Sequence, residues 1–82
     1  MSDLSFMEDL VKKMAQALVD RPNEVSVREV AGQTVSVMEL RVAKADMPKI
    51  IGKHGKHADA IRIVISAAGQ KLGRRCMVEI VE

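Results

Sequence analysis

The sequence predicts one small α+β domain spanning residues 1–82, with helices and strands in the order α-β-β-α-α-β. Apolar residues recur at helical spacing near the N-terminus and again after residue 56, whereas three other segments are rich in β-branched and alternating apolar residues. Apolar residues make up 48% of this 82-residue chain, which suffices for one hydrophobic core. Helices before and after an adjacent pair of strands are typical of the α+β class.

The N-terminal half should form a helix followed by a β-hairpin. A helix is predicted over 5–19, where a stripe of apolar residues has helical spacing: Met7, Leu10, Val11, Met14 and Leu18. The run Asp20-Arg21-Pro22-Asn23 should end this helix. Strands are predicted over 24–30 and 34–42, and the short turn Ala31-Gly32-Gln33 between them makes them antiparallel.

The C-terminal half should form two helices and a strand. Asp46 can cap a short helix over 47–52, in which Pro48 is tolerated in the first turn. A longer helix is predicted over 56–72, with a core face made of Ile61, Val64, Ile65, Ala68 and Leu72. The last strand is predicted over 75–81.

The single cysteine and the N-terminal composition indicate the compartment. Cys76 lies in the last predicted strand and has no cysteine partner for an internal disulfide, so we expect a buried free thiol. The N-terminus lacks the basic segment and apolar block of a signal peptide, and no stretch approaches the ~20 apolar residues that a membrane span needs. These features predict a cytoplasmic protein.

The run Ile50-Ile51-Gly52-Lys53-His54-Gly55-Lys56 joins the two C-terminal helices. Its glycines can adopt a positive φ and let the backbone approach another molecule closely. Amides at the start of the next helix would point out of the loop with partial positive charge, and Lys53 and Lys56 add full charges beside them. A loop of this composition suits a phosphodiester backbone, although two glycines can also serve only as helix caps.

Positive charge concentrates around this loop. Residues 44–75 carry eight basic and two acidic side chains, a net charge of +6, whereas residues 1–43 and 76–82 each have a net charge of −2. This distribution is expected of a surface that binds nucleic acid. Phe6 is the only aromatic residue, which argues against modules that stack bases on aromatic side chains.

The loop and its neighbours resemble the core of the KH RNA-binding domain. That core has an apolar pair, a G-x-x-G loop with a basic residue and an apolar-faced helix, here Ala60-Ile61-Arg62 followed by Val64-Ile65. With the α-β-β-α-α-β order, the run Leu40-Arg41-Val42-Ala43 and Asp46, nearly the whole chain is similar to the small stand-alone bacterial KH proteins of the KhpA family. The resemblance implies the type II KH fold, with a three-stranded mixed sheet and three helices packed on one face.

The resemblance also implies a site, because KH loops clamp about four nucleotides of a single strand. The residues expected to contact RNA are Ile50, Ile51, Gly52, Lys53, His54, Gly55, Lys56, Ile61, Arg62, Arg74 and Arg75. The three isoleucines should divide between the core and an aliphatic groove. Arg74 and Arg75 either close the far side of the groove or are ordinary surface charges. Ala58 replaces the larger aliphatic residue of many KH domains, which should make the groove shallower.

Enzymatic, metal and cofactor chemistry are not expected. The sequence lacks the P-loop pattern, and its serine, histidine and acidic residues form no recognisable triad. His54 and His57 have Asp59 nearby but neither a cysteine nor a third histidine, so we expect no metal site.

Two functions of different classes therefore stay open. The first is an RNA-binding protein that holds single-stranded RNA in post-transcriptional regulation or RNA chaperoning. The second is a structural or interaction protein that acts mainly through protein contacts and has a degenerate KH loop. The resemblance also implies a homodimer, a heterodimer with a larger RNA-binding protein, or both. We expect no association with a membrane. Pairing would compensate through avidity for a footprint of about four nucleotides.

Overall fold

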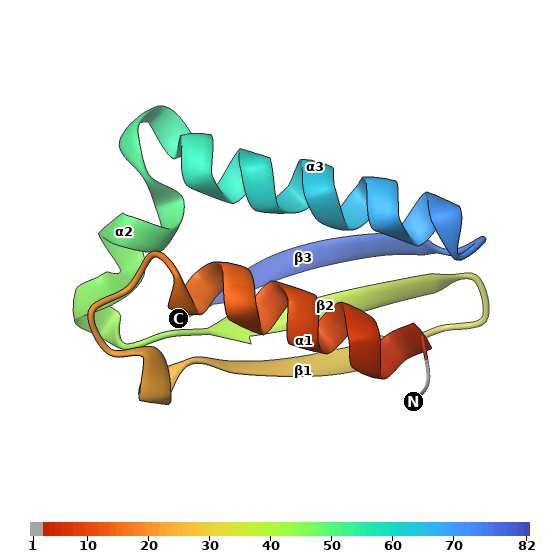
Figure 1. The fold of residues 1–82 in the computed structure, drawn as a ribbon, viewed down its shortest axis with the longest axis horizontal. Helices are drawn as coiled ribbons and strands as arrows, with labels where there is room; N and C mark the ends of the chain where they lie inside the picture. The colour runs from red at the N-terminus through yellow and green to blue at the C-terminus, as the bar shows by residue number, and fades with distance from the viewer. Residues whose placement is uncertain (1–2) are drawn as a thin grey trace.

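The computed structural model describes the backbone of residues 3–82 and the side chains from residue 6 onward. The chain folds in the predicted order, with helices and strands α1 (Asp3–Gln16), β1 (Ser26–Ala31), β2 (Val35–Arg41), α2 (Met47–Ile51), α3 (Lys56–Lys71) and β3 (Arg75–Val81) (Figure 1). Single turns of 3-10 helix lie at Pro22–Glu24, Lys44–Asp46 and Lys53–Gly55. Within residues 3–82, no helix is long and apolar enough to cross a membrane.

The strands form one mixed sheet in the order β1-β2-β3, as predicted. β1 and β2 are antiparallel, and their register places Glu29 opposite Met38. β2 and β3 are parallel, with Met38 opposite Val78. Parallel neighbours need a long crossover, which α2 and α3 supply between the end of β2 and the start of β3. β3 is therefore an edge strand, and α3 runs along it (Figure 1).

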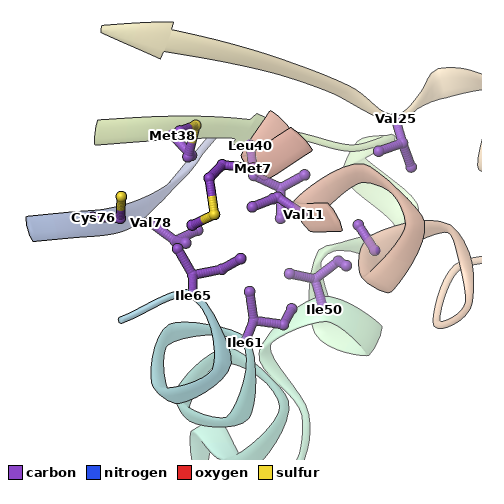
Figure 2. Packing of buried hydrophobic residues seen from close by; sticks show 11 residues of the cluster. Met7, Val11, Val25, Met38, Leu40, Ile50, Ile61, Ile65, Cys76 and Val78 are labelled. Carbon is purple, nitrogen blue, oxygen red and sulfur yellow. The ribbon is translucent and has the colours of Figure 1, made fainter. Parts of the chain in front are cut away.

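The hydrophobic core lies between one face of the sheet and the helices (Figure 2). Successive side chains of a strand point to opposite faces, so every second residue of β2 and β3 points into the core. The buried apolar residues of the core are Met7, Val11, Ala15, Val25, Met38, Leu40, Ile50, Ile61, Ile65, Cys76 and Val78. Burial of each of the larger side chains contributes about 1.5–3 kcal/mol to folding.

α1 ends three residues earlier than predicted, and β1 begins two residues later. The amide of Leu18 donates to the carbonyl of Ala15, which tightens the chain into a turn after α1. Leu18 and Val19 still pack against the core as connecting residues, and this explains why the apolar pattern continues past the helix. The amide of Val25 donates to the carbonyl of Pro22, so the predicted start of the strand is a 3-10 turn instead.

Four of the five residues predicted for the core face of α3 are confirmed: Ile61 and Ile65 are buried in the core, and Ala68 and Leu72 pack against it. The buried residues of α3 also include Ala58 and Gly69. Val64, which we expected in the core, is 44% exposed. α3 packs on β3, and a Cβ atom at Gly69 would lie only 2.9 Å from the Sγ of Cys76, so this close approach requires glycine. Cys76 is a buried free thiol, as predicted, and burial raises its pKa against the opposing effect of Arg74.

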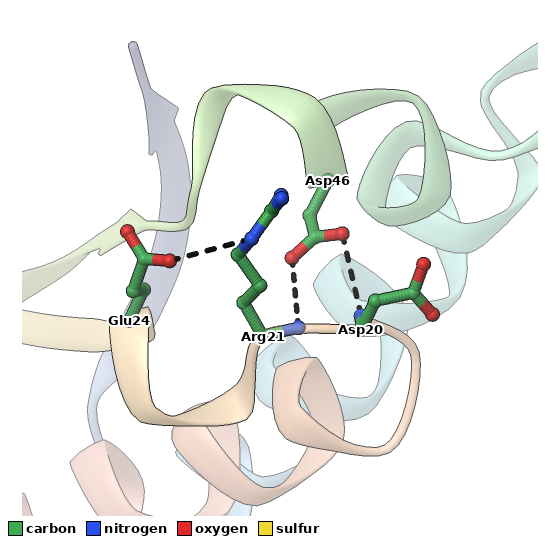
Figure 3. Close-up of polar contacts among 4 residues, drawn as sticks. All are labelled: Asp20, Arg21, Glu24 and Asp46. Carbon is green, nitrogen blue, oxygen red and sulfur yellow. Dashed lines mark hydrogen bonds and ion pairs between the residues drawn. The ribbon is translucent and has the colours of Figure 1, made fainter.

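Asp46 connects the α1–β1 segment to the start of α2 (Figure 3). It is only 1% exposed, and its carboxylate accepts hydrogen bonds from the backbone amides of Asp20, at 3.3 Å, and Arg21, at 3.1 Å. The prediction that this side chain caps the short helix is wrong, because the carboxylate binds the α1–β1 segment and not the first amides of α2. Lys49 of α2 adds an ion pair with Asp20 at 3.0 Å. These contacts fix the position of α2 and of the loop that follows it.

Replacement of Asp46 by alanine should destabilise the fold. Two backbone amides would be left without their charged acceptor, and we expect the free energy of unfolding to fall by about 1–3 kcal/mol. Urea unfolding followed by circular dichroism measures this change. Asp9→Ala is the matched control: among the described residues Asp9 forms one ion pair, with the exposed Lys13, so the substitution should cost at most about 0.5 kcal/mol. Equal destabilisation in the two variants would show that the buried hydrogen bonds of Asp46 contribute nothing.

Candidate nucleic-acid interface

The loop between α2 and α3 is a tight turn with an unusual backbone. Gly52 ends α2 with φ 75° and ψ 171°, and its amide donates to the carbonyl of Pro48 at 2.8 Å. His54 and Gly55 follow with φ values of 58° and 73°, and the amide of Gly55 donates to the carbonyl of Gly52 at 3.1 Å. A positive φ is uncommon for a residue with a side chain, and such strained positions gather at functional sites. The sequence did not indicate this conformation of His54.

Gly52 lies against the ring of His57, in the first turn of α3. A Cβ atom at Gly52 would lie 2.6 Å from the Cγ of His57, which is too close for any side chain. The Nδ1 atom of His57 lies 2.7 Å from the carbonyl oxygen of Lys49 and must carry the proton, since a carbonyl only accepts. His57 is exposed, lies within the helix predicted over 56–72, and links that helix to α2 through its ring. Gly55 has open space around it, so only its φ requires glycine.

The loop presents positive charges that form no ion pair among the described residues. Lys53, His54 and Lys56 are exposed, and the ion pairs found among the described residues involve none of them. Lys49, one turn before the loop, is instead held by Asp20. The loop therefore keeps three exposed basic side chains outside any ion pair found among the described residues.

A groove lies beside the loop, between α2, the first turns of α3 and the end of β3. It is a hollow of about 420 Å³ lined by Met47, Ile51, Gly55, Ala58, Asp59, Arg62, Ile80 and Glu82. The three predicted isoleucines divide unequally: Ile51 is 42% exposed and lines the groove, whereas Ile50 and Ile61 are 0% and 3% exposed and belong to the core. Ala58 is only 4% exposed and lines the groove.

Arg62 of α3 lines the groove and has contacts to both β3 and its own helix. Its Nε donates to the carbonyl of Val78 on β3 at 3.4 Å, and its guanidinium lies 3.8 Å from the carboxylate of Asp59. The ion pair is exposed, with the Arg62 side chain 49% exposed, so it contributes little to stability.

Arg74 and Arg75 lie at the opposite end of α3 from the loop, a helix length of about 24 Å away. A second hollow there, of about 430 Å³, is lined by Ser66, Gln70, Gly73, Arg74 and Arg75. The guanidinium of Arg74 donates to the Oγ of Ser36 and to the carbonyls of Gly32 and Gln33. Arg74 thus holds the β1–β2 turn in place, and Arg75 is the exposed cation of the pair.

Sequence reasoning missed four groove residues: Met47, Asp59, Ile80 and Glu82. The alternation of the last strand, in which Cys76 and Val78 point inward, would have placed Ile80 on the same face. Met47 lies four residues before Ile51, and hence on the same side of α2. No pattern in the sequence indicated the two acidic residues. Among the described residues, no three histidine, cysteine or acidic side chains are grouped so as to hold a metal ion.

A glycine loop between two helices, beside an aliphatic groove that an edge strand closes, defines a KH-type domain. The family model of the KhpA/KhpB KH domain matches residues 8–80, and the chain belongs to this family. Curated relatives named RNA-binding protein KhpA are similar over nearly the whole chain. The relative from Clostridium acetobutylicum is 49% identical over 75 residues, covering 92% of this chain and 100% of the relative. That from Aquifex aeolicus is 42% identical over 79 residues, covering 96% and 100%.

Two solved structures of Era share the fold. Aquifex aeolicus Era bound to GDP·AlF4⁻ superposes with a TM-score of 0.69 at 22% identity, over 92% of this chain and 29% of Era. Era in complex with MgGDPNP and nucleotides 1506–1542 of 16S ribosomal RNA superposes with a TM-score of 0.64 at 23% identity, over 90% of this chain and 28% of Era. The chain spans less than a third of Era, and at this identity the likeness concerns the fold alone.

The contact between Gly52 and His57 can be tested by a double-mutant cycle. Gly52→Ala forces alanine into a backbone conformation that is essentially restricted to glycine, and it adds the clash against the ring. Gly55→Ala has only the cost of about 1–2 kcal/mol for a left-handed residue. Gly52→Ala should therefore destabilise the fold more than Gly55→Ala. Removal of the ring by His57→Ala should make Gly52→Ala less costly. Urea unfolding of the four proteins in the cycle measures this coupling. Additive effects would mean that the ring does not constrain position 52.

Proposed function

We propose that the protein binds single-stranded RNA, with the loop against the phosphate backbone and the bases in the groove. One observation supports this most: the exposed, unpaired Lys53, His54 and Lys56 stand on a glycine-shaped backbone directly beside an aliphatic groove. The family relatives are named RNA-binding proteins, which agrees with this interpretation of the site.

In the proposed complex, the parts of the site act on different parts of the strand. Gly52 and Gly55 let phosphates approach the loop backbone, and the lysines supply point charges beside them. The bases lie across Ile51, Ala58 and the β3 edge, where backbone groups outside the sheet ladder can hydrogen-bond to exposed base edges. Arg62 gives up its contacts in the groove to the ligand, and Arg75 extends the positive surface at the far end.

The proposed role is to hold and present RNA, and no chemical step is assigned to the protein. Holding flexible single strands suits post-transcriptional regulation or RNA chaperoning, in the cytoplasm where transcripts are exposed. We assign residues 1–82 to this one KH domain. A protein acting mainly through protein contacts, with an inactive loop, is the alternative that the binding experiment below distinguishes.

We further propose that two copies pair through the outer surface of α3. Ile63 is 69% exposed and Val64 44% exposed, and Phe6 of α1, which is 51% exposed, lines a hollow with Ala68 and Leu72 further along α3. Apolar side chains grouped on the surface of a small protein mark an interaction site. Ala60 and Ala67 lie one turn before and after, so the same helix of a second copy can approach closely across a two-fold axis. A larger RNA-binding partner would use the same surface.

Charge reversal in the loop should abolish most RNA affinity. Lys53→Asp combined with His54→Asp places negative charge where phosphates are proposed to lie, and both side chains are exposed, so the fold should persist. We expect at least a tenfold rise in Kd in a filter-binding assay with single-stranded RNA. The slope of log affinity against log salt should also become flatter, by about 0.7 for each phosphate that the variant no longer neutralises.

The matched control is Lys12→Asp combined with Asn23→Asp, which adds the same kind of charge on exposed residues of α1 and of the α1–β1 segment. This control should keep its affinity within about twofold, as expected for charges screened beyond about 10 Å. Unlabelled duplex RNA should compete poorly, because a duplex hides the base edges. An equal fall in affinity in both variants, or equal competition by duplex, would mean that the protein reads only net charge.

Ile63→Asp should prevent self-association. Its side chain is exposed, so the variant should fold, but two-fold pairing would bring two unpaired carboxylates together in an apolar contact. Sedimentation at micromolar concentrations should give a dimer for the unaltered protein and a monomer for the variant. Thr34→Asp, in the exposed β1–β2 turn, is the control and should remain dimeric. A monomeric unaltered protein would contradict the proposal.

A further inference from the structure

A further hollow adjoins the groove at the end of the molecule where α2 lies over the ends of β2 and β3 (Figure 1). Its volume is about 470 Å³, and it is lined by Val42, Lys44, Met47, Pro48 and Glu82. Two of these residues, Met47 and Glu82, also line the groove. The two hollows are therefore neighbours on one continuous surface, on either side of Met47.

The walls of this hollow are held in place by the fold. Arg41 of β2 lies opposite Val81 of β3 in the parallel register, so the residues that follow them, Val42 and Glu82, leave the sheet side by side. Nη1 of Arg41 donates to the backbone carbonyl of Glu82 at 3.3 Å. Met47 belongs to the end of α2 that the buried Asp46 anchors. The hollow is thus part of the folded domain.

The side chains that line the hollow are chemically suited to bind a nucleobase. Val42, Met47 and Pro48 present apolar surface, and a base has two apolar faces. Lys44 is exposed and is absent from the ion pairs found within residues 3–82, so its charge is free for a phosphate at the rim. The negative charge of Glu82 repels phosphate from the opposite side and so favours one orientation of a bound nucleotide. The volume lies in the range of about 300–1,000 Å³ that small-ligand sites occupy.

We infer that this hollow binds one further nucleotide of the same single strand, directly beyond the groove. Its base lies against Met47 and Pro48, and its phosphate lies beside Lys44. The inference rests on the proposed function, because the strand reaches the hollow only by continuing from the groove past Met47. The binding site then extends beyond the nucleotides that the loop and groove hold.

A length series with single-stranded RNA tests this inference. A longer RNA can bind a four-nucleotide site in more than one register. Lengthening the RNA from four to six nucleotides therefore raises the affinity of such a site by at most about threefold. An additional base contact should raise it by about tenfold in total, which corresponds to about 1.4 kcal/mol. A six-nucleotide RNA with abasic sugars at both ends keeps its phosphates but lacks the terminal bases. This RNA should gain no more affinity over the four-nucleotide RNA than the additional registers alone provide.

Lys44→Glu should reduce the gain from four to six nucleotides to about threefold or less, whereas Lys12→Glu should leave that gain unchanged. A gain that never exceeds the register effect, or that persists with abasic ends and in Lys44→Glu, overturns the inference while the proposed function stands. If RNA of every length fails to bind, or if the charge reversal in the loop leaves RNA affinity unchanged, the proposed function and this inference are both wrong.

Discussion

The packing of Gly52 against the ring of His57 is the contact on which the rest of the interface depends. A side chain at position 52 would begin 2.6 Å from the ring, so only glycine lets the first turn of α3 lie on the end of α2. The ring also binds the carbonyl of Lys49 at 2.7 Å and thus joins the two helices. With the helices this close, the chain must reverse within Lys53–Gly55, and His54 takes a left-handed conformation. The shape of the loop follows from helix packing as much as from the loop residues.

The groove depends on two further contacts, one on each side of the loop. Asp46 holds α2 through the amides of Asp20 and Arg21, which fixes the wall that Ile51 occupies. At the far end of α3, the missing side chain of Gly69 allows the helix to approach Cys76, which sets the distance from α3 to the edge of β3. The width of the groove is therefore determined at points outside it, by residues that a ligand would not touch.

The element order, the sheet and the glycine loop were predictable, because helical spacing, strand alternation and turn residues are local signals. The groove was not, because its walls come from segments far apart in the chain, such as Met47 and Ile80. The sequence could not decide which of two adjacent isoleucines faces the core, since both suit either environment; packing buries Ile50 and exposes Ile51. Arg74 illustrates the same limit. From the sequence alone an arginine cannot be distinguished from an ordinary surface charge, and the carbonyl partners of Arg74 are known only from the structure.

The two parts of the interface differ in charge, and this difference suggests a division of labour in the proposed complex. Lys53 and Lys56 of the loop take part in none of the ion pairs found among the described residues, whereas in the groove Arg62 pairs with Asp59 and Glu82 adds a second carboxylate. Phosphate contacts supply affinity that is independent of sequence, so the loop would supply affinity and the groove would choose among bases. With no aromatic residue among those that line it, the groove has little further affinity to gain from stacking. Stronger binding would then come from additional contacts along the same RNA strand, either in the neighbouring hollow or on a second copy of the chain.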